Sequence, residues 1–267
     1  MISTNNFIFG RYIPGNAWIY KMNPIMKIIL TFYFTLIVFL ANNWISYAIL
    51  WLLAIISIYF SGINIKTFFN GIKAILFIIL ITVIIQILFS VNGNVIFNYG
   101  PIKITNLGIK YGIFIFFRFT LIVIASTILT LSTKPLAIAY GIEKIMSPLN
   151  KLHFPVEVLS LMISIALRFV PTLIDEISSI IKAQKARGAN FNNGNLIKRA
   201  NAIASIFIPL FLVAMNHASD LGDAMVSRGY KSNVKRSQYH HYHINHIDWI
   251  SCFTYLLFGV LIVFIRK

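Results

Sequence analysis

The chain has 267 residues, of which 58% are hydrophobic and 11% are charged, with 23 Lys and Arg against 7 Asp and Glu. This composition is far too apolar for a soluble domain and indicates a membrane protein. The net charge of +16 does not indicate nucleic-acid binding, because no basic face interleaved with aromatic residues accompanies it, and positive flanks around membrane spans account for it.

The apolar runs of the chain predict transmembrane helices. Residues 1–23 lack the apolar core of a signal peptide and are expected to lie at the membrane interface. About 20 mostly apolar residues cross the hydrocarbon core, and the runs lack the alternation of barrel strands. They predict five spans, at residues 24–41, 43–61, 66–91, 108–133 and 247–265.

The distribution of charge predicts the orientation of these spans, because cytoplasmic loops carry an excess of Lys and Arg. Cations precede the first span, lie between the second and third, and follow the fourth, whereas the 41–43 turn has none. The N-terminus and residues 134–246 are therefore expected in the cytoplasm. The cations concerned are Arg11, Lys21, Lys27, Lys66, Lys73 and Lys134.

Two single residues inside predicted spans are expected to be structural. Arg118 lies in the fourth span, where a charge is costly, and is expected to snorkel or to pair with Gln86. Cys252 is the one cysteine, so no internal disulfide exists, and it is expected to be a small core or lipid-facing residue.

The region from 134 to 246 breaks the membrane pattern. A short helix is expected over 136–147, followed by two long amphipathic helices over 154–188 and 195–228. Pro171 and Pro209 lie inside the long helices and are predicted to kink them. The fold expected is an all-α polytopic membrane protein. Its parts are an N-terminal membrane domain at 1–133, a cytoplasmic domain of long kinked helices at 134–246 and a C-terminal transmembrane helix at 247–267.

Both long helices end in an Arg-Gly pair, within Ala186-Arg187-Gly188 and Ser227-Arg228-Gly229. A single such end is ordinary capping chemistry, because glycine suits the left-handed position after a helix and arginine complements the negative helix end. Each end, however, follows an aromatic-aliphatic-proline step, Phe169-Val170-Pro171 in the first helix and Phe207-Ile208-Pro209 in the second. The repeated pattern predicts two similar helix tips presented to a partner.

The Phe-x-Pro steps, the two Arg-Gly tips and the stretch 223–230 (Asp-Ala-Met-Val-Ser-Arg-Gly-Tyr) resemble the transmembrane T component of energy-coupling-factor (ECF) transporters. These are ATP-driven importers of vitamins and trace metals in prokaryotic cell membranes, and the resemblance covers essentially the whole chain. The family usually carries an Asp-Pro-Arg-x-Lys-like element before its first span. The corresponding residues 23–27 (Asn-Pro-Ile-Met-Lys) keep the proline and lysine but lack the acid and arginine.

The resemblance implies a subunit without catalysis or cofactor. Its tips would dock into two cytoplasmic ABC-type ATPase subunits, one arginine per subunit, and its long helices would support a small membrane protein that captures the substrate (the S component). The residues implied in ATPase binding are Ala186, Arg187, Gly188, Ser227, Arg228 and Gly229.

Other functions are weighed against this one. No P-loop, Gly-x-Ser-x-Gly elbow or His-Glu-x-x-His helix occurs in the sequence. Four histidines, His240, His241, His243 and His246, would suit Zn²⁺, Ni²⁺ or Co²⁺, but only Asp248 lies near them, and an interfacial linker is preferred. The alternatives are a membrane metalloenzyme using residues 240–246, an ion-coupled carrier, and a dedicated T component of a cobalt or nickel importer. The carrier is disfavoured because the first four spans contain no Asp or Glu.

Overall fold

The computed structural model describes residues 12, 14–15, 17–63, 65–90, 93–99, 102–152, 154–189, 196–231, 242 and 244–265. It divides into two compact units, which are considered separately below. The first unit, here called the membrane bundle, comprises Met1–Ile145 and His241–Lys267. The second, here called the long-helix unit, comprises Met146–His240.

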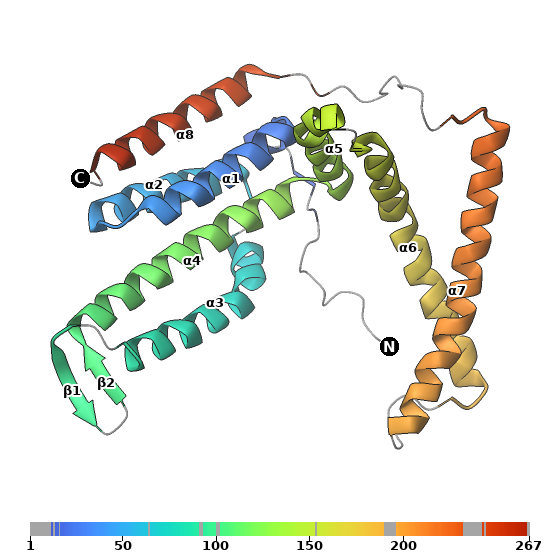
Figure 1. Ribbon diagram of the computed structural model, residues 1–267, viewed down its shortest axis with the longest axis horizontal. Coiled ribbons are helices and arrows are strands. Elements are labelled where there is room, and N and C mark those ends of the chain that lie inside the picture. The colour runs from blue at the N-terminus through green and yellow to red at the C-terminus, as the bar shows by residue number, and fades with distance from the viewer. Residues whose placement is uncertain are drawn as a thin grey trace. The chain divides into compact units, whose positions relative to one another are not determined.

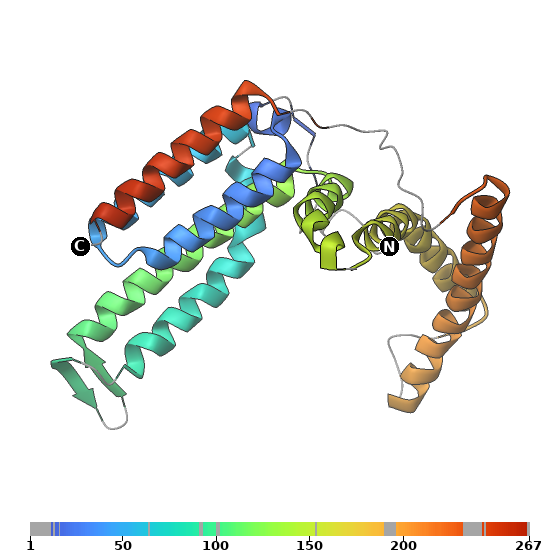
Figure 2. The same cartoon turned by 45° about the horizontal axis from the view of Figure 1, so that its top comes forward.

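The membrane bundle is built around α4, which packs against α1, α2 and α3, while α8 packs against α1 and α2 (Figures 1 and 2). Segments far apart in sequence are thus neighbours, since α8 is the last helix of the chain and α1 the first. The elements of the bundle are η2 (Trp18–Lys21), α1 (Pro24–Leu40), α2 (Trp44–Ser61), α3 (Ile65–Leu88), β1 (Val95–Tyr99), β2 (Ile102–Thr105), α4 (Asn106–Ser132), α5 (Pro135–Met146, whose last residue falls in the other unit) and α8 (His246–Ile265).

The core of the bundle forms where α1, α2, α4 and α8 meet. Val38, Tyr47, Leu50, Leu121 and Ile262 are among its fully buried side chains. The Tyr47 ring also stacks on the ring of Phe114 in α4, with the two centroids 5.1 Å apart. Large apolar side chains on the outer helix surfaces are exposed instead, as expected where lipid replaces water around a transmembrane bundle.

Cations cap two antiparallel helices of the bundle at opposite ends. Lys27 near the start of α1 donates from Nζ to the backbone oxygen of Ser132, the last residue of α4, at 3.2 Å. Arg118 of α4 donates from Nη2 to the backbone oxygen of Ala41, the C-cap of α1, at 3.2 Å. Helix C-termini leave carbonyl groups without intrahelical partners and carry partial negative charge, so each cation stabilises the other helix's end. The partner of Arg118 is therefore the end of α1 and not Gln86.

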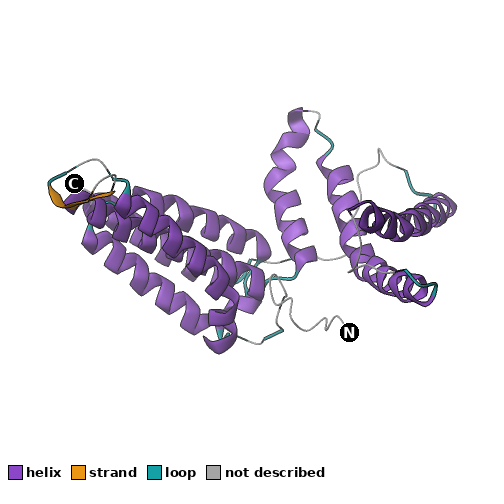
Figure 3. Cartoon of the chain, turned by 90° about the horizontal axis from the view of Figure 1, so that it is seen from below, coloured by secondary structure: helices purple, strands orange, loops and turns teal. Residues whose placement is uncertain are grey.

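A β-hairpin that was not predicted from the sequence lies between α3 and α4. Val95–Tyr99 and Ile102–Thr105 pair antiparallel, with a register shift between Val95 and Phe97. Both segments carry β-branched and aromatic residues, which favour strands, but they are too short to produce a clear alternating pattern. Helices otherwise dominate the described residues, as Figure 3 shows, which confirms the all-α polytopic class.

The long-helix unit contains η3 (Ser147–Leu152), α6 (Val156–Ala186) and α7 (Leu196–Ser227). The two long helices pack against each other and run in opposite general directions (Figure 1). Between them, the rings of Phe169 and His217 stack with centroids 5.7 Å apart. Pro171 and Pro209 lie inside helices that continue through them, and the predicted kinks stay predictions.

Six helices among the described residues are long and apolar enough to cross a membrane, where the sequence predicted five spans. The six include α6 and, in α7, Ala202–Ser227, which the sequence analysis assigned to the cytoplasm, while α1 is shorter than the rest. For α7 the reason is that its charges lie near its two ends and leave residues 202–219 uncharged. Length and composition therefore do not exclude α6 and α7 from the bilayer.

The contact between α1 and α8 yields a first prediction. Gly259 of α8 is buried, and a Cβ at this position would lie 2.8 Å from Cδ1 of Ile37 and closer still to the Tyr33 hydroxyl. Gly259→Ala is expected to destabilise the bundle by about 1–3 kcal/mol through overpacking. The matched control is Gly71→Ala in α3, where nothing lies within 4 Å and alanine should stabilise the helix by about 0.5–1 kcal/mol. Thermal unfolding in detergent should thus shift in opposite directions, and equal shifts would contradict the packing described.

Candidate functional site

The first Arg-Gly pair closes α6 with a complete Schellman motif. Arg187 is the C-cap residue and Gly188 follows it in the left-handed conformation, with φ of 85°. The Gly188 N–H donates to the oxygen of Lys185 at 3.0 Å, and the Ala189 N–H donates to the oxygen of Gln184 at 3.0 Å. These two bonds define the motif and satisfy carbonyl groups that the helix end leaves without partners.

The second Arg-Gly pair closes α7 in the same way. Gly229 has φ of 72°, its N–H donates to the oxygen of Val226 at 2.9 Å, and the Tyr230 N–H donates to the oxygen of Met225 at 3.0 Å. Arg228 therefore occupies the same position as Arg187 relative to its helix. The Arg-Gly pattern that the sequence repeats therefore has the same type of backbone geometry at both tips.

Backbone conformation, and not crowding, requires glycine at the two tips. A Cβ built at Gly188 or Gly229 would have no atom within 4 Å, so there is space for a side chain. The positive φ at each position is what disfavours other residues. The tips are therefore open surfaces whose shape is set by hydrogen bonds of the main chain.

Both tip arginines are exposed. Within the part of the chain that the structure describes, neither the Arg187 nor the Arg228 side chain has a hydrogen-bond or ion-pair partner. Because the glycine motif already satisfies the helix carbonyls, the guanidinium groups are not needed as caps. A guanidinium in this setting offers five N–H donors in a planar fork, which suits a carboxylate of another molecule.

An apolar surface runs along α7 between its ends. It is formed by large side chains that are each more than half exposed, in a helix that carries charges near its two ends. Such a surface in contact with water is a liability, so lipid or another protein must cover it. Its residues are Ile203, Phe207, Ile208, Phe211, Leu212 and Met215.

A buried polar junction in the membrane bundle was not predicted. Asp248 of α8 is fully buried, and its carboxylate accepts hydrogen bonds from the backbone N–H of Asn23, at 2.9 Å, and of Asn245, at 2.8 Å. Asn23 in turn caps α1, since its Oδ1 accepts from the Ile25 N–H at 2.9 Å. The element at 23–27 thus ties the start of α1 to the start of α8.

A sequence signal for this junction existed. Asp248 stands three residues after Asn245, and an acid at this spacing after a helix-capping residue is typical of a capping box. In the structure one carboxylate oxygen makes that box bond to Asn245, and the other reaches Asn23, which is far away in sequence. No local pattern predicts the second bond.

The histidine-rich segment lies mostly outside the described residues, which include Tyr242 and His246 but not His240, His241 or His243. The Tyr242 ring packs on that of Tyr140 in α5, with centroids 5.0 Å apart. His246 is exposed at the start of α8. No group of three His, Cys, Asp or Glu within the described ranges could hold a metal ion.

Comparisons with known proteins cover nearly the whole chain. The family model CbiQ, described as cobalt transport protein, matches residues 15–240. The energy-coupling factor transporter transmembrane protein EcfT of Lacticaseibacillus paracasei is 40% identical over 262 residues, covering 98% of this chain and 99% of that protein. The protein of the same name from Lactobacillus helveticus is 43% identical over 261 residues, covering 97% and 94%. EcfT 1 of Listeria monocytogenes is 40% identical over 259 residues, covering 97% of each chain.

The buried junction yields a second prediction. Asp248→Ala leaves the N–H groups of Asn23 and Asn245 without their acceptor, and leaving the buried N–H of Asn23 unsatisfied costs about 1–3 kcal/mol. We expect a lower midpoint of thermal unfolding in detergent and faster trypsin cleavage near the start of α1. Asp248→Asn keeps one side-chain oxygen and should lie between the wild type and the alanine variant. Wild-type stability of Asp248→Ala would show that the junction contributes nothing.

Proposed function

Because the chain belongs to the EcfT family of energy-coupling factor transporter transmembrane proteins, we propose that it is a non-catalytic subunit that couples ATP hydrolysis in partner proteins to import. The tips of α6 and α7 bind one cytoplasmic ABC-type ATPase subunit each. The long helices transmit the motion of these subunits to a separate membrane protein that captures the substrate.

The observation that carries this proposal is the identical geometry of the two tips. Both place an exposed arginine at the C-cap of a long helix and follow it with a left-handed glycine. Since α6 and α7 run in opposite general directions, their C-terminal ends lie at opposite ends of the helix pair (Figure 1). Two equivalent contacts that lie apart suit two copies of one partner or two similar partners.

The length of the helices suits transmission. With 31 and 32 residues, α6 and α7 each extend about 45–50 Å at 1.5 Å per residue. Packing between the two helices, including the stack of the Phe169 and His217 rings, joins them into one unit. A displacement at either tip would therefore move the whole pair.

The chemistry of arginine suits a groove that contains a carboxylate. Guanidinium and carboxylate form two parallel charge-assisted hydrogen bonds, whereas lysine offers a single point charge. We propose that Arg187 and Arg228 each make such a contact and that the neighbouring Ala186 and Ser227 lie at the edge of the same interface. The glycines at 188 and 229 set the angle at which the chain leaves it.

The apolar surface of α7 suits the substrate-capture protein. Its exposed Phe207 and Phe211 would pack against a hydrophobic partner within or next to the bilayer, which removes the liability of exposing them to water. This arrangement requires the N-terminus and both tips to be on the cytoplasmic side of the cell membrane, as the positive flanks of the spans predict.

We do not favour a metalloenzyme or an ion-coupled carrier. The chain belongs to a family of transporter subunits, and this membership supports neither alternative. The histidines at 240, 241 and 243, which a metalloenzyme would use, lie outside the described residues. The relatives compared above bear the name energy-coupling factor transporter transmembrane protein EcfT, which mentions no metal, so a dedicated cobalt or nickel importer is also not favoured.

Substituting the tip arginines tests the proposal. Arg187→Ala and Arg228→Ala should each weaken ATPase binding by about 2–5 kcal/mol, the usual cost of truncating one partner of a desolvated charge pair. The double variant should lose the ATPases on purification from membranes and abolish uptake. The matched control is Lys185→Ala, which removes an exposed cation from the same helix end. Normal co-purification and uptake by the double variant would refute the proposed contacts.

The glycines provide a separate test that keeps the arginines. Gly188→Ala combined with Gly229→Ala forces a side chain into the left-handed conformation, at a cost of roughly 1–2 kcal/mol per position. The tips should then adopt another backbone path, and ATPase co-purification should fall although both guanidinium groups remain. The control is Gly222→Ala, at a helical glycine of α7 where an added Cβ would have no atom within 4 Å. This variant should bind the ATPase subunits normally.

A further inference from the structure

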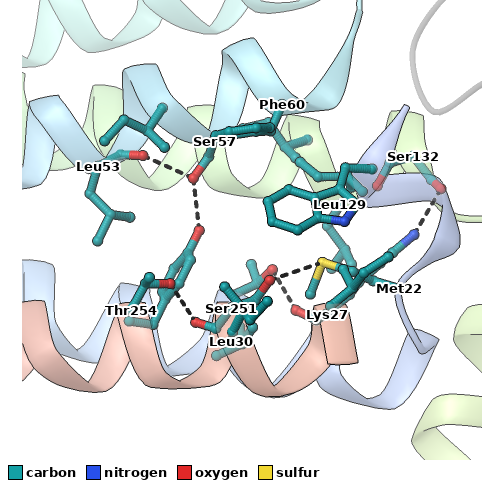
Figure 4. Close-up of a pocket in the computed structure, with 18 of the residues that line it drawn as sticks. Met22, Lys27, Leu30, Leu53, Ser57, Phe60, Leu129, Ser132, Ser251 and Thr254 are labelled. Carbon is teal, nitrogen blue, oxygen red and sulfur yellow. Dashed lines mark hydrogen bonds between the residues drawn. The ribbon is translucent and has the colours of Figure 1, made fainter. Parts of the chain in front are cut away.

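A cavity of about 190 Å³ in the membrane bundle is lined by residues of η2, α1, α2, α4 and α8 (Figure 4). Its walls are mostly apolar and include Leu30, Leu53, Phe60 and Leu129. An engineered apolar cavity of about 150 Å³ in a soluble protein stays free of water and binds benzene. The cavity is therefore large enough to hold part of a hydrocarbon chain.

The hydroxyl groups on the cavity wall already have partners. Ser57 Oγ donates to the backbone oxygen of Leu53 at 2.9 Å (Figure 4). It also lies 3.0 Å from the hydroxyl of Tyr255. Thr31 and Thr254 donate to backbone oxygens of their own helices at 2.8 Å. The donors of these hydroxyls are therefore engaged, and most of the surface left for a ligand is hydrocarbon.

The cavity reaches the outer surface of the bundle between α2 and α8. Ile56 and Phe60 of α2 line it and are each 42% exposed, and Ile250 of α8 lines it and is 50% exposed. In a bilayer, the hydrocarbon available at such a surface is the acyl chain of a lipid. An acyl chain therefore has a path into the cavity and a surface that matches it.

Lys27 lies at one end of the cavity, where it also interacts electrostatically with the buried Asp248. The Lys27 ammonium group has three N–H donors, of which Ser132 O and Thr133 Oγ1 take two. Lys21 lies exposed at the end of η2, close in sequence to Trp18, which also lines the cavity. Trp at this position is typical of the level of lipid head groups, where Lys attracts anionic lipids.

We propose that this cavity binds one anionic phospholipid, with an acyl chain between α2 and α8 and the phosphate near Lys21 and Lys27. The lipid completes the packing of four helices at the end of the bundle where the Asp248 junction lies. The site is independent of the tips of α6 and α7, so its test does not depend on ATPase binding.

Native mass spectrometry of the full chain in mild detergent tests the proposal, with phosphatidylglycerol and phosphatidylcholine as the added lipids. The wild type should retain one phosphatidylglycerol, with at least tenfold preference over phosphatidylcholine. Ser251→Phe places a ring in the cavity and should reduce retention at least tenfold. Cys252→Phe adds the same ring one residue along, outside the cavity wall, and should retain the lipid. Lys21→Glu should remove the preference for phosphatidylglycerol.

Equal retention by the Ser251→Phe and Cys252→Phe variants would overturn the cavity as the site, and equal binding of the two lipids by the wild type would overturn its anionic character. A second measurement on the wild type covers the case in which Ser251→Phe fails to fold. Phosphatidylglycerol with a photoreactive group on its acyl chain should label Leu53 or Leu129. Labelling confined to outward side chains such as Phe253, which is 68% exposed, would overturn the proposal.

Discussion

A helix end without partners is costly inside a membrane, because no water is present to satisfy its carbonyl groups. The membrane bundle depends on how this constraint is met between α1 and α4. Lys27 of α1 binds the last residue of α4, and Arg118 of α4 binds the C-cap of α1, so each helix closes the end of the other. The two cations hold an antiparallel pair in register, and the remaining helices pack around it.

The two long helices of the long-helix unit satisfy the carbonyl groups at their ends by a different means. They end in glycine motifs, in which backbone N–H groups satisfy the carbonyls and no side chain is needed. In the bundle Lys27 and Arg118 bind helix ends, whereas at the tips Arg187 and Arg228 stay exposed. The choice of cap thus separates cations that hold the fold together from cations that are available to a partner.

The sequence predicted much of this structure for identifiable reasons. Helix bounds agree to within three residues because long apolar runs, prolines and Arg-Gly ends are local signals. The partners of Asp248 and Arg118 were not predictable, since Asn23 and Ala41 are distant in sequence and contribute only backbone atoms. The hairpin at 95–105 was missed because its strands are short. The uncharged centre of α7 was not singled out as a possible span because charges lie near both ends of the helix.

The left-handed glycine after each tip arginine has a further consequence, for the entropy of association. A residue on a flexible loop must be immobilised each time it binds, and ordering costs affinity. Here the main chain around Arg187 and Arg228 is already fixed by hydrogen bonds on both sides, so only side-chain rotamers remain to be ordered. In the proposed contact with the ATPase subunits, less ordering would therefore be needed each time a tip binds.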